Sequence, residues 1–125
     1  MKIIPRFYHG VLDYLSGLLL LLAPNLFGFA DLGGATAWVP RIAGLLILGQ
    51  AMMTDYELGL MKVIPIGMHL KADYVVGAGL LVAPFVFGIS GRSLTATVLL
   101  VVMALLAFGA AAMTQPSGRP REIMP

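Results

Sequence analysis

Two histidine–aspartate pairs are the residues of this sequence with the clearest capacity for chemistry. His9 stands four residues before Asp13, and His69 stands four residues before Asp73. Because residues i and i+4 share one face of a helix, each pair presents an imidazole beside a carboxylate. Such groups ligate metal ions, and an aspartate can also orient a histidine that holds a haem or a chlorophyll-like pigment. A ligand site built from the two pairs is therefore one hypothesis.

The two pairs occupy equivalent positions in a duplicated unit. Without any gap, residues 1–5 align with 61–65, residues 9–28 with 69–88, and residues 45–54 with 105–114. Similarity at one fixed offset along a chain indicates a tandem repeat of about 60 residues. We expect a first repeat at 1–60, a second repeat at 61–114 and a flexible tail at 115–125.

The composition predicts a membrane protein. Of the 125 residues, 59% are hydrophobic and only 11% are charged, whereas a soluble domain carries about 25% charged residues. The net charge of +2 is too small to indicate nucleic-acid binding. The absence of cysteine excludes disulfides and thiolate metal sites.

Four apolar helices are expected, arranged as two hairpins. The first begins at Arg6 and runs for about 24 residues, which is enough to cross a hydrocarbon core of about 30 Å. The others are predicted at about 37–54, 66–89 and 94–113. Pro24 and Pro84 should kink the first and third helices. A cleavable signal peptide is the alternative for the first helix, but the same segment recurs in the middle of the chain.

Aromatic and small residues suggest how the helices sit and pack. The aromatic residues expected to anchor the bundle at the membrane interface are Tyr14, Trp38, Tyr56 and Tyr74. Small residues concentrate on the second and fourth helices, which suits close helix contacts in lipid. They are Ala43, Gly44, Gly49, Ala51, Ala104, Ala107, Gly109, Ala110, Ala111 and Ala112. These faces predict a homo-oligomer or a membrane protein partner.

The basic residues predict the orientation. One end of the bundle collects Lys2, Arg6, Lys62, Lys71, Arg119 and Arg121, and the other end has Arg41 and Arg92. Because basic residues accumulate on the cytoplasmic side, both termini should be cytoplasmic. Two crossings per repeat give both copies the same orientation, so their pseudo-two-fold axis runs along the membrane normal.

Three roles remain open for the paired residues. In the first, which the sequence favours, they are structural: each aspartate accepts a hydrogen bond from its histidine and pairs with Arg6 or Lys71. In the second, His9, Asp13, His69 and Asp73 bind a haem, a pigment or a metal ion. In the third, Asp13 and Asp73 relay protons or a small solute, although residues 18–22 and 98–102 offer no polar continuation.

No enzymatic activity is predicted. The sequence holds no nucleophile–base set and no glycine-rich phosphate loop that follows a strand. The favoured expectation is a protein without a cofactor that acts through helix–helix contacts.

The segments Ala23-Pro24-Asn25-Leu26-Phe27-Gly28 and Ala83-Pro84-Phe85-Val86-Phe87-Gly88 resemble the SPW-repeat family of small bacterial and archaeal membrane proteins. Alanine stands here for the serine of the family motif, and Asn25 and Phe85 stand for its tryptophan. Thr54-Asp55-Tyr56-Glu57-Leu58-Gly59 is also similar to members of that group. The resemblance implies two membrane crossings per repeat and no established activity. We therefore expect an all-α integral membrane four-helix bundle in a bacterial inner membrane.

Overall fold

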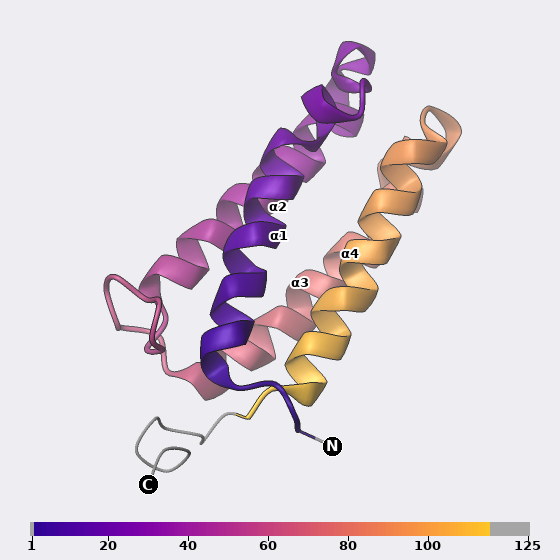
Figure 1. Cartoon of the computed structure of the whole chain (residues 1–125). Helices are drawn as coiled ribbons and strands as arrows, with labels where there is room; N and C mark the ends of the chain where they lie inside the picture. Colours follow the sequence, from indigo (N-terminus) through magenta and orange to yellow (C-terminus); the bar gives the residue numbers. More distant parts are fainter. Residues whose placement is uncertain (1, 116–125) are drawn as a thin grey trace, which may run out of the picture.

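Four long helices make up the computed structural model, which describes residues 2–115 (Figure 1). One short 3-10 turn connects the two helices of each half. The elements in chain order are α1 (Arg6–Leu26), η1 (Ala30–Leu32), α2 (Gly34–Met53), α3 (Ile66–Val86), η2 (Ile89–Gly91) and α4 (Leu94–Met113). The predicted all-α bundle is confirmed. Of the predicted tail at 115–125, only Gln115 is described, and its N–H donates to the Ile4 carbonyl; residues 116–125 lie outside the described part of the chain.

The helices form two antiparallel hairpins, α1 with α2 and α3 with α4 (Figure 1). The bounds of α3 and α4 lie 60 residues after those of α1 and α2 at every helix end (6 to 66, 26 to 86, 34 to 94, 53 to 113). The two halves of the sequence therefore adopt the same local structure.

Prolines and glycines delimit the first helix of each hairpin. Pro5 and Pro65 precede α1 and α3. A proline is suited to this position because its missing N–H would have no intrahelical acceptor. Gly28 and Gly88 follow the helices with φ of 75° and 71°, a region that glycine enters without a steric penalty.

The predicted first and third helices were too long at their C-terminal ends. Pro24 and Pro84 lie only two residues before the last residues of α1 and α3, Leu26 and Val86. Each proline removes a backbone donor near the end of its helix, and the chain leaves the helix at the glycine that follows, Gly28 or Gly88, whose φ is positive. A bend of the helix axis at these prolines remains a prediction.

A close backbone approach holds the first hairpin together. A Cβ atom on Gly44 of α2 would lie 2.5 Å from the Gly17 carbonyl oxygen and 2.6 Å from the Leu21 nitrogen of α1. Only glycine leaves the space for this contact. Van der Waals contact of this kind is what holds helices together in lipid, as the small-residue pattern predicted.

The two hairpins share one apolar core. Its buried members come from both halves and are Leu20, Ala23, Phe29, Leu80, Ile89, Ala96, Leu100, Met103 and Ala104. At the end of the bundle that carries the hairpin turns, Arg92 Nη2 donates a 2.8 Å hydrogen bond to the Leu32 carbonyl oxygen. This contact links the connection of one hairpin to that of the other.

At the opposite end of the bundle, backbone hydrogen bonds connect the two repeats to each other. The Ile4 N–H donates to the Met113 carbonyl (2.8 Å), and the Gln115 N–H donates to the Ile4 carbonyl (2.9 Å). The equivalent bridge joins Thr54 to Ile64, within the connector between α2 and α3. The start of each repeat is thus bound to the end of the other.

All four helices are long and apolar enough to cross a membrane. Their 20 or 21 residues correspond to about 30 Å at 1.5 Å per residue. Large apolar side chains point outward, among them Leu46 (62% exposed), Val75 (73%) and Leu105 (58%). The chain is a multi-pass membrane protein whose outer surface contacts the lipid bilayer.

Candidate metal centre

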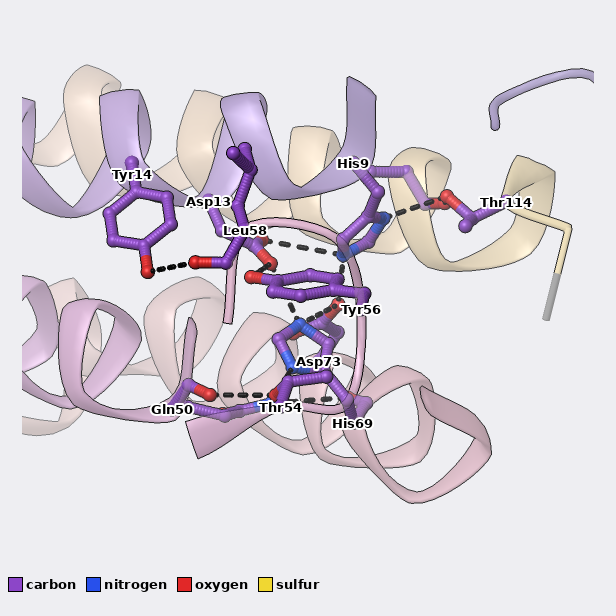
Figure 2. A network of polar contacts seen from close by, with 11 residues as sticks. His9, Asp13, Tyr14, Gln50, Thr54, Tyr56, Leu58, His69, Asp73 and Thr114 are labelled. Atoms are coloured by element: carbon purple, nitrogen blue, oxygen red, sulfur yellow. Dashed lines mark hydrogen bonds and ion pairs between the residues drawn. The ribbon is translucent and has the colours of Figure 1, made fainter. Parts of the chain in front are cut away.

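The two histidine–aspartate pairs meet at the interface between the hairpins, near the N-terminal ends of α1 and α3 (Figure 2). The shortest contacts cross between repeats. His9 Nε2 lies 2.8 Å from Asp73 Oδ2, and His69 Nε2 lies 2.8 Å from Asp13 Oδ2. Within each repeat, the i,i+4 contacts are longer, at 3.3 Å for His9–Asp13 and 3.4 Å for His69–Asp73.

These four contacts make a closed ring in which imidazole and carboxylate groups alternate. The ring runs from His9 to Asp13, His69, Asp73 and back to His9. One ligand-type atom from each side chain lies within 4.8 Å of all the others. Both imidazoles are 1% exposed, and the carboxylates of Asp13 and Asp73 are 13% and 14% exposed. The arrangement is therefore almost withdrawn from solvent.

One threonine hydroxyl lies at the Nδ1 edge of each imidazole. Thr114 Oγ1 lies 2.7 Å from His9 Nδ1, and Thr54 Oγ1 lies 2.5 Å from His69 Nδ1. Each hydroxyl donates its single proton to a backbone carbonyl four residues earlier, that of Ala110 or Gln50. Each threonine oxygen must then accept from Nδ1–H. Both histidines thus carry a proton on Nδ1 and turn Nε2 toward the ring.

Tyr56 gives one carboxylate an additional partner. Tyr56 is 2% exposed, and its hydroxyl donates a 3.0 Å hydrogen bond to Asp13 Oδ2. Burial, together with the nearby Asp13 carboxylate, raises the pKa of the Tyr56 phenol, which keeps it a donor. The repeat position that aligns with Tyr56 is Pro116, which has no hydroxyl. The sequence pattern is therefore not symmetric at this position.

The Nε2 atom of His69 is buried without a hydrogen bond. No carboxylate oxygen meets His69 Nε2 in hydrogen-bonding geometry within the described residues, although Asp13 Oδ2 is 2.8 Å away. His9 Nε2 does have such a partner in Asp73. A buried polar atom in this condition costs free energy unless something else satisfies it.

The other predicted site residues lie apart from the ring. Tyr14 donates to the Leu58 carbonyl (2.8 Å), and Tyr74 is 44% exposed. At the other end of the bundle, Trp38 is 56% exposed. The Arg41 guanidinium carbon lies over the Trp38 side chain, 5.0 Å from the centroid of the indole. These three positions are compatible with interface anchors. The position of Tyr56 is not compatible with an interface anchor, because its side chain is buried and its hydroxyl donates to Asp13.

The structural hypothesis for the aspartates needs a second correction. Sequence reasoning paired them with Arg6 or Lys71. Arg6 instead lies 3.6 Å from Glu57, and no ion pair involving Lys71 is present within residues 2–115. The carboxylates face the histidines of the opposite repeat because α1 and α3 turn their paired residues toward each other.

Sequence reasoning missed the threonines. Thr54 and Thr114 are aligned residues of the two repeats, and both lie immediately after a helix that packs beside the histidines. A pair of identical hydroxyl residues in an otherwise apolar repeat was the available signal. The same comparison would not have found Gln50, because its counterpart is Ala110.

Fold and composition together define a small polytopic α-helical membrane protein built from two helical hairpins. The SPW repeat domain matches residues 7–114, and the chain belongs to this family. The resemblance seen in the two proline segments is thereby confirmed. No curated protein and no solved structure matches the chain.

Proposed function

We propose that this protein binds a divalent transition-metal ion in the ring formed by His9, Asp13, His69 and Asp73. The observation that carries the proposal is the convergence of two Nε2 atoms and two carboxylates while both Nδ1 atoms are held by threonines. A second hydrogen bond of this kind is what orients metal-bound histidines. The Nε2 atom of His69 supports the same assignment, because it is buried and the nearby Asp13 carboxylate does not meet it in hydrogen-bonding geometry.

The donor set matches such an ion in chemistry and in charge. Imidazole with carboxylate oxygen suits Zn²⁺ and related divalent ions. Two aspartates supply two negative charges, which balance the ion. A site without net charge is favourable at the edge of an apolar bundle, where an uncompensated charge is expensive.

A macrocycle fits the geometry less well than a bare ion. The imidazole centroids are 5.2 Å apart, with an angle of 80° between the ring planes. Both carboxylates lie within 3.4 Å of the Nε2 atoms. They occupy the space between the imidazoles that a haem or a pigment would need.

The test is a Zn²⁺ titration of chelator-washed protein in lipid nanodiscs, with a competing metal indicator. We expect one ion per chain, and we expect His9→Ala/His69→Ala to abolish binding. Asp31→Asn is the matched control, because this carboxylate lies in η1 at the other end of the bundle. Failure of the wild-type protein to bind, or equal binding by the double variant with native helicity, would overturn the proposal.

A structural and accessory role is the second candidate. Its support is that two of the four contacts, His9–Asp73 and His69–Asp13, join α1 to α3 across the repeats, so the ring also clamps the hairpins together. Gly49 and Gly109 have open space around them, which leaves a small-residue face on α2 and on α4 for a homo-oligomer or a partner. The mass of the detergent-solubilised protein, measured with and without Gly49→Leu/Gly109→Leu, tests this role. Proton or solute conduction gains no support, since the shared core is apolar.

We also propose a location in a bacterial inner membrane with both termini in the cytoplasm. The end of the bundle near the ring carries Lys2, Arg6, Lys62 and Lys71, and the end with the hairpin turns carries Arg41 and Arg92. The excess of basic residues supports this orientation. The ring would then lie close to the cytoplasmic surface.

A further inference from the structure

A cavity of about 270 Å³ lies between α1 and α4 and reaches the ring. We call it the α1–α4 pocket. Its polar end is formed by His9, Asp13 and Asp73, and its remaining wall is mostly apolar, with Leu12, Leu80 and Leu106 as typical members. Pockets with apolar walls and a few convergent polar groups are the usual form of small-molecule sites.

The two repeats differ at two positions of α4 that line the pocket. Ala107 and Ala110 of α4 line it, and their counterparts in α2 are Ile47 and Gln50. At the equivalent corner between α2 and α3, Gln50 Nε2 donates a 3.2 Å hydrogen bond to the carbonyl oxygen of His69. The alanines offer neither the volume nor the hydrogen bond. The corner between α1 and α4 therefore stays hollow.

Side chains at the margin of the pocket face the bilayer. Leu12, Leu105 and Leu106 line it and are 43%, 58% and 56% exposed. Since these residues lie in membrane-spanning helices, the surface around the pocket contacts lipid. A ligand dissolved in the bilayer has the most direct access.

The polar end of the pocket can accept hydrogen bonds. Asp73 Oδ2 contacts both histidines, whereas Asp73 Oδ1 has no hydrogen bond or ion pair within residues 2–115. No lysine or arginine is among the lining residues. Two carboxylates without a lysine or an arginine disfavour an anionic headgroup and favour one that is cationic and donates hydrogen bonds.

We propose that the α1–α4 pocket binds a membrane-soluble amine, with its ammonium group at Asp73 and its apolar chain between α1 and α4. The inference goes beyond metal binding and does not depend on it. It rests on the cavity, on the unpaired carboxylate oxygen and on the alanines that leave the corner open. The ammonium donates to Asp73 Oδ1, and the apolar chain replaces lipid against Leu12 and Leu106.

Octylammonium is a suitable probe. Its binding to chelator-washed protein in phosphatidylcholine nanodiscs is measured by equilibrium dialysis, with empty nanodiscs subtracted. We expect saturable binding with one site per chain. Octanoate of the same chain length should not bind. Asp73→Asn should weaken octylammonium binding about tenfold or more, because a charge-assisted hydrogen bond is lost.

Ala107→Ile/Ala110→Gln supplies the decisive comparison. It installs the residues that the first repeat already carries, fills the pocket and leaves every residue of the ring unchanged. We expect this variant to lose the amine site and to keep Zn²⁺ binding, so failure of one proposal is distinguishable from failure of the other. Unchanged octylammonium binding by this variant, or equal binding of octanoate by the wild-type protein, would overturn the pocket proposal.

Discussion

His9 Nδ1 and Thr114 Oγ1 are 2.7 Å apart, although 105 residues separate them in the chain. The aligned residues of the other half, His69 and Thr54, make the same contact. Each histidine is thus oriented by a threonine from the opposite repeat. Backbone bridges at Thr114 and Thr54 hold these threonines in place. Thr54 and Thr114 therefore both connect the two repeats and orient the histidines of the ring.

Removing the threonine hydroxyls should weaken metal binding without removing a ligand. Thr54→Val/Thr114→Val retains shape but leaves each Nδ1–H buried without an acceptor, which should lower Zn²⁺ affinity about 10–100-fold. The unfolding free energy should fall by about 1–3 kcal/mol per site. Competitive titration and denaturant unfolding measure the two effects.

Thr97→Val is the matched control, because the Thr97 hydroxyl makes the same i−4 bond, to Ser93, away from the ring. It should change the stability by less than about 0.5 kcal/mol. If Thr97→Val and the double variant had equal effects on affinity, the orienting role of the threonines would be wrong.

Stability should fall at alkaline pH because of Tyr56. Its pKa is raised in the folded protein, while the unfolded phenol titrates near pH 10. Above that pH, the unfolded chain releases a proton that the folded chain retains, so the free energy of unfolding decreases as the pH rises. Tyr56→Phe should remove this part of the decrease, and Tyr8→Phe should leave it unchanged, since Tyr8 is 59% exposed. Identical pH profiles of Tyr56→Phe and the wild-type protein would refute the assignment.

The close approach of α1 and α2 should tolerate no side chain at Gly44. Gly44→Ala places a Cβ against backbone atoms of α1 and should cost about 1–3 kcal/mol of stability. Gly49→Ala lies on the same helix with nothing within 4 Å and should be neutral or stabilising. Thermal unfolding in detergent compares the two, and a Gly49→Ala loss as large as that of Gly44→Ala would contradict this packing.

The proposed orientation can be tested with single cysteines, because the chain has none of its own. Ser90→Cys lies in η2 at one end of the bundle, and Leu60→Cys lies in the connector at the other end. A membrane-impermeant maleimide added to intact cells should label the first and spare the second. The reverse pattern would place the ring at the outer surface.

Much of the fold could be predicted from the sequence, because its causes are local or repeated. Apolar runs of about 20 residues predict membrane helices, and the 60-residue offset places His9 and His69 at equivalent positions. The prolines were harder to interpret. Pro24 proved to lie in the last turn of its helix, since Gly28 shortly afterwards accommodates the positive φ with which the chain leaves it.

The crossed pairing inside the ring could not be predicted. The i,i+4 rule pairs His9 with Asp13, yet the shorter contact joins His9 to Asp73. That choice depends on how two hairpins rotate about each other, which helix periodicity does not determine. The burial of Tyr56 could not be predicted either, because it depends on how the connector between α2 and α3 folds back against α1.

X-ray absorption spectroscopy of the Zn²⁺-loaded protein in nanodiscs tests the central claim most directly. The proposal predicts an ion bound by two imidazole nitrogens and by oxygen atoms, with one imidazole lost from the spectrum in His9→Ala or in His69→Ala. A spectrum with oxygen ligands alone, unchanged in both variants, would contradict it. The ring would then act as a clamp between the two hairpins.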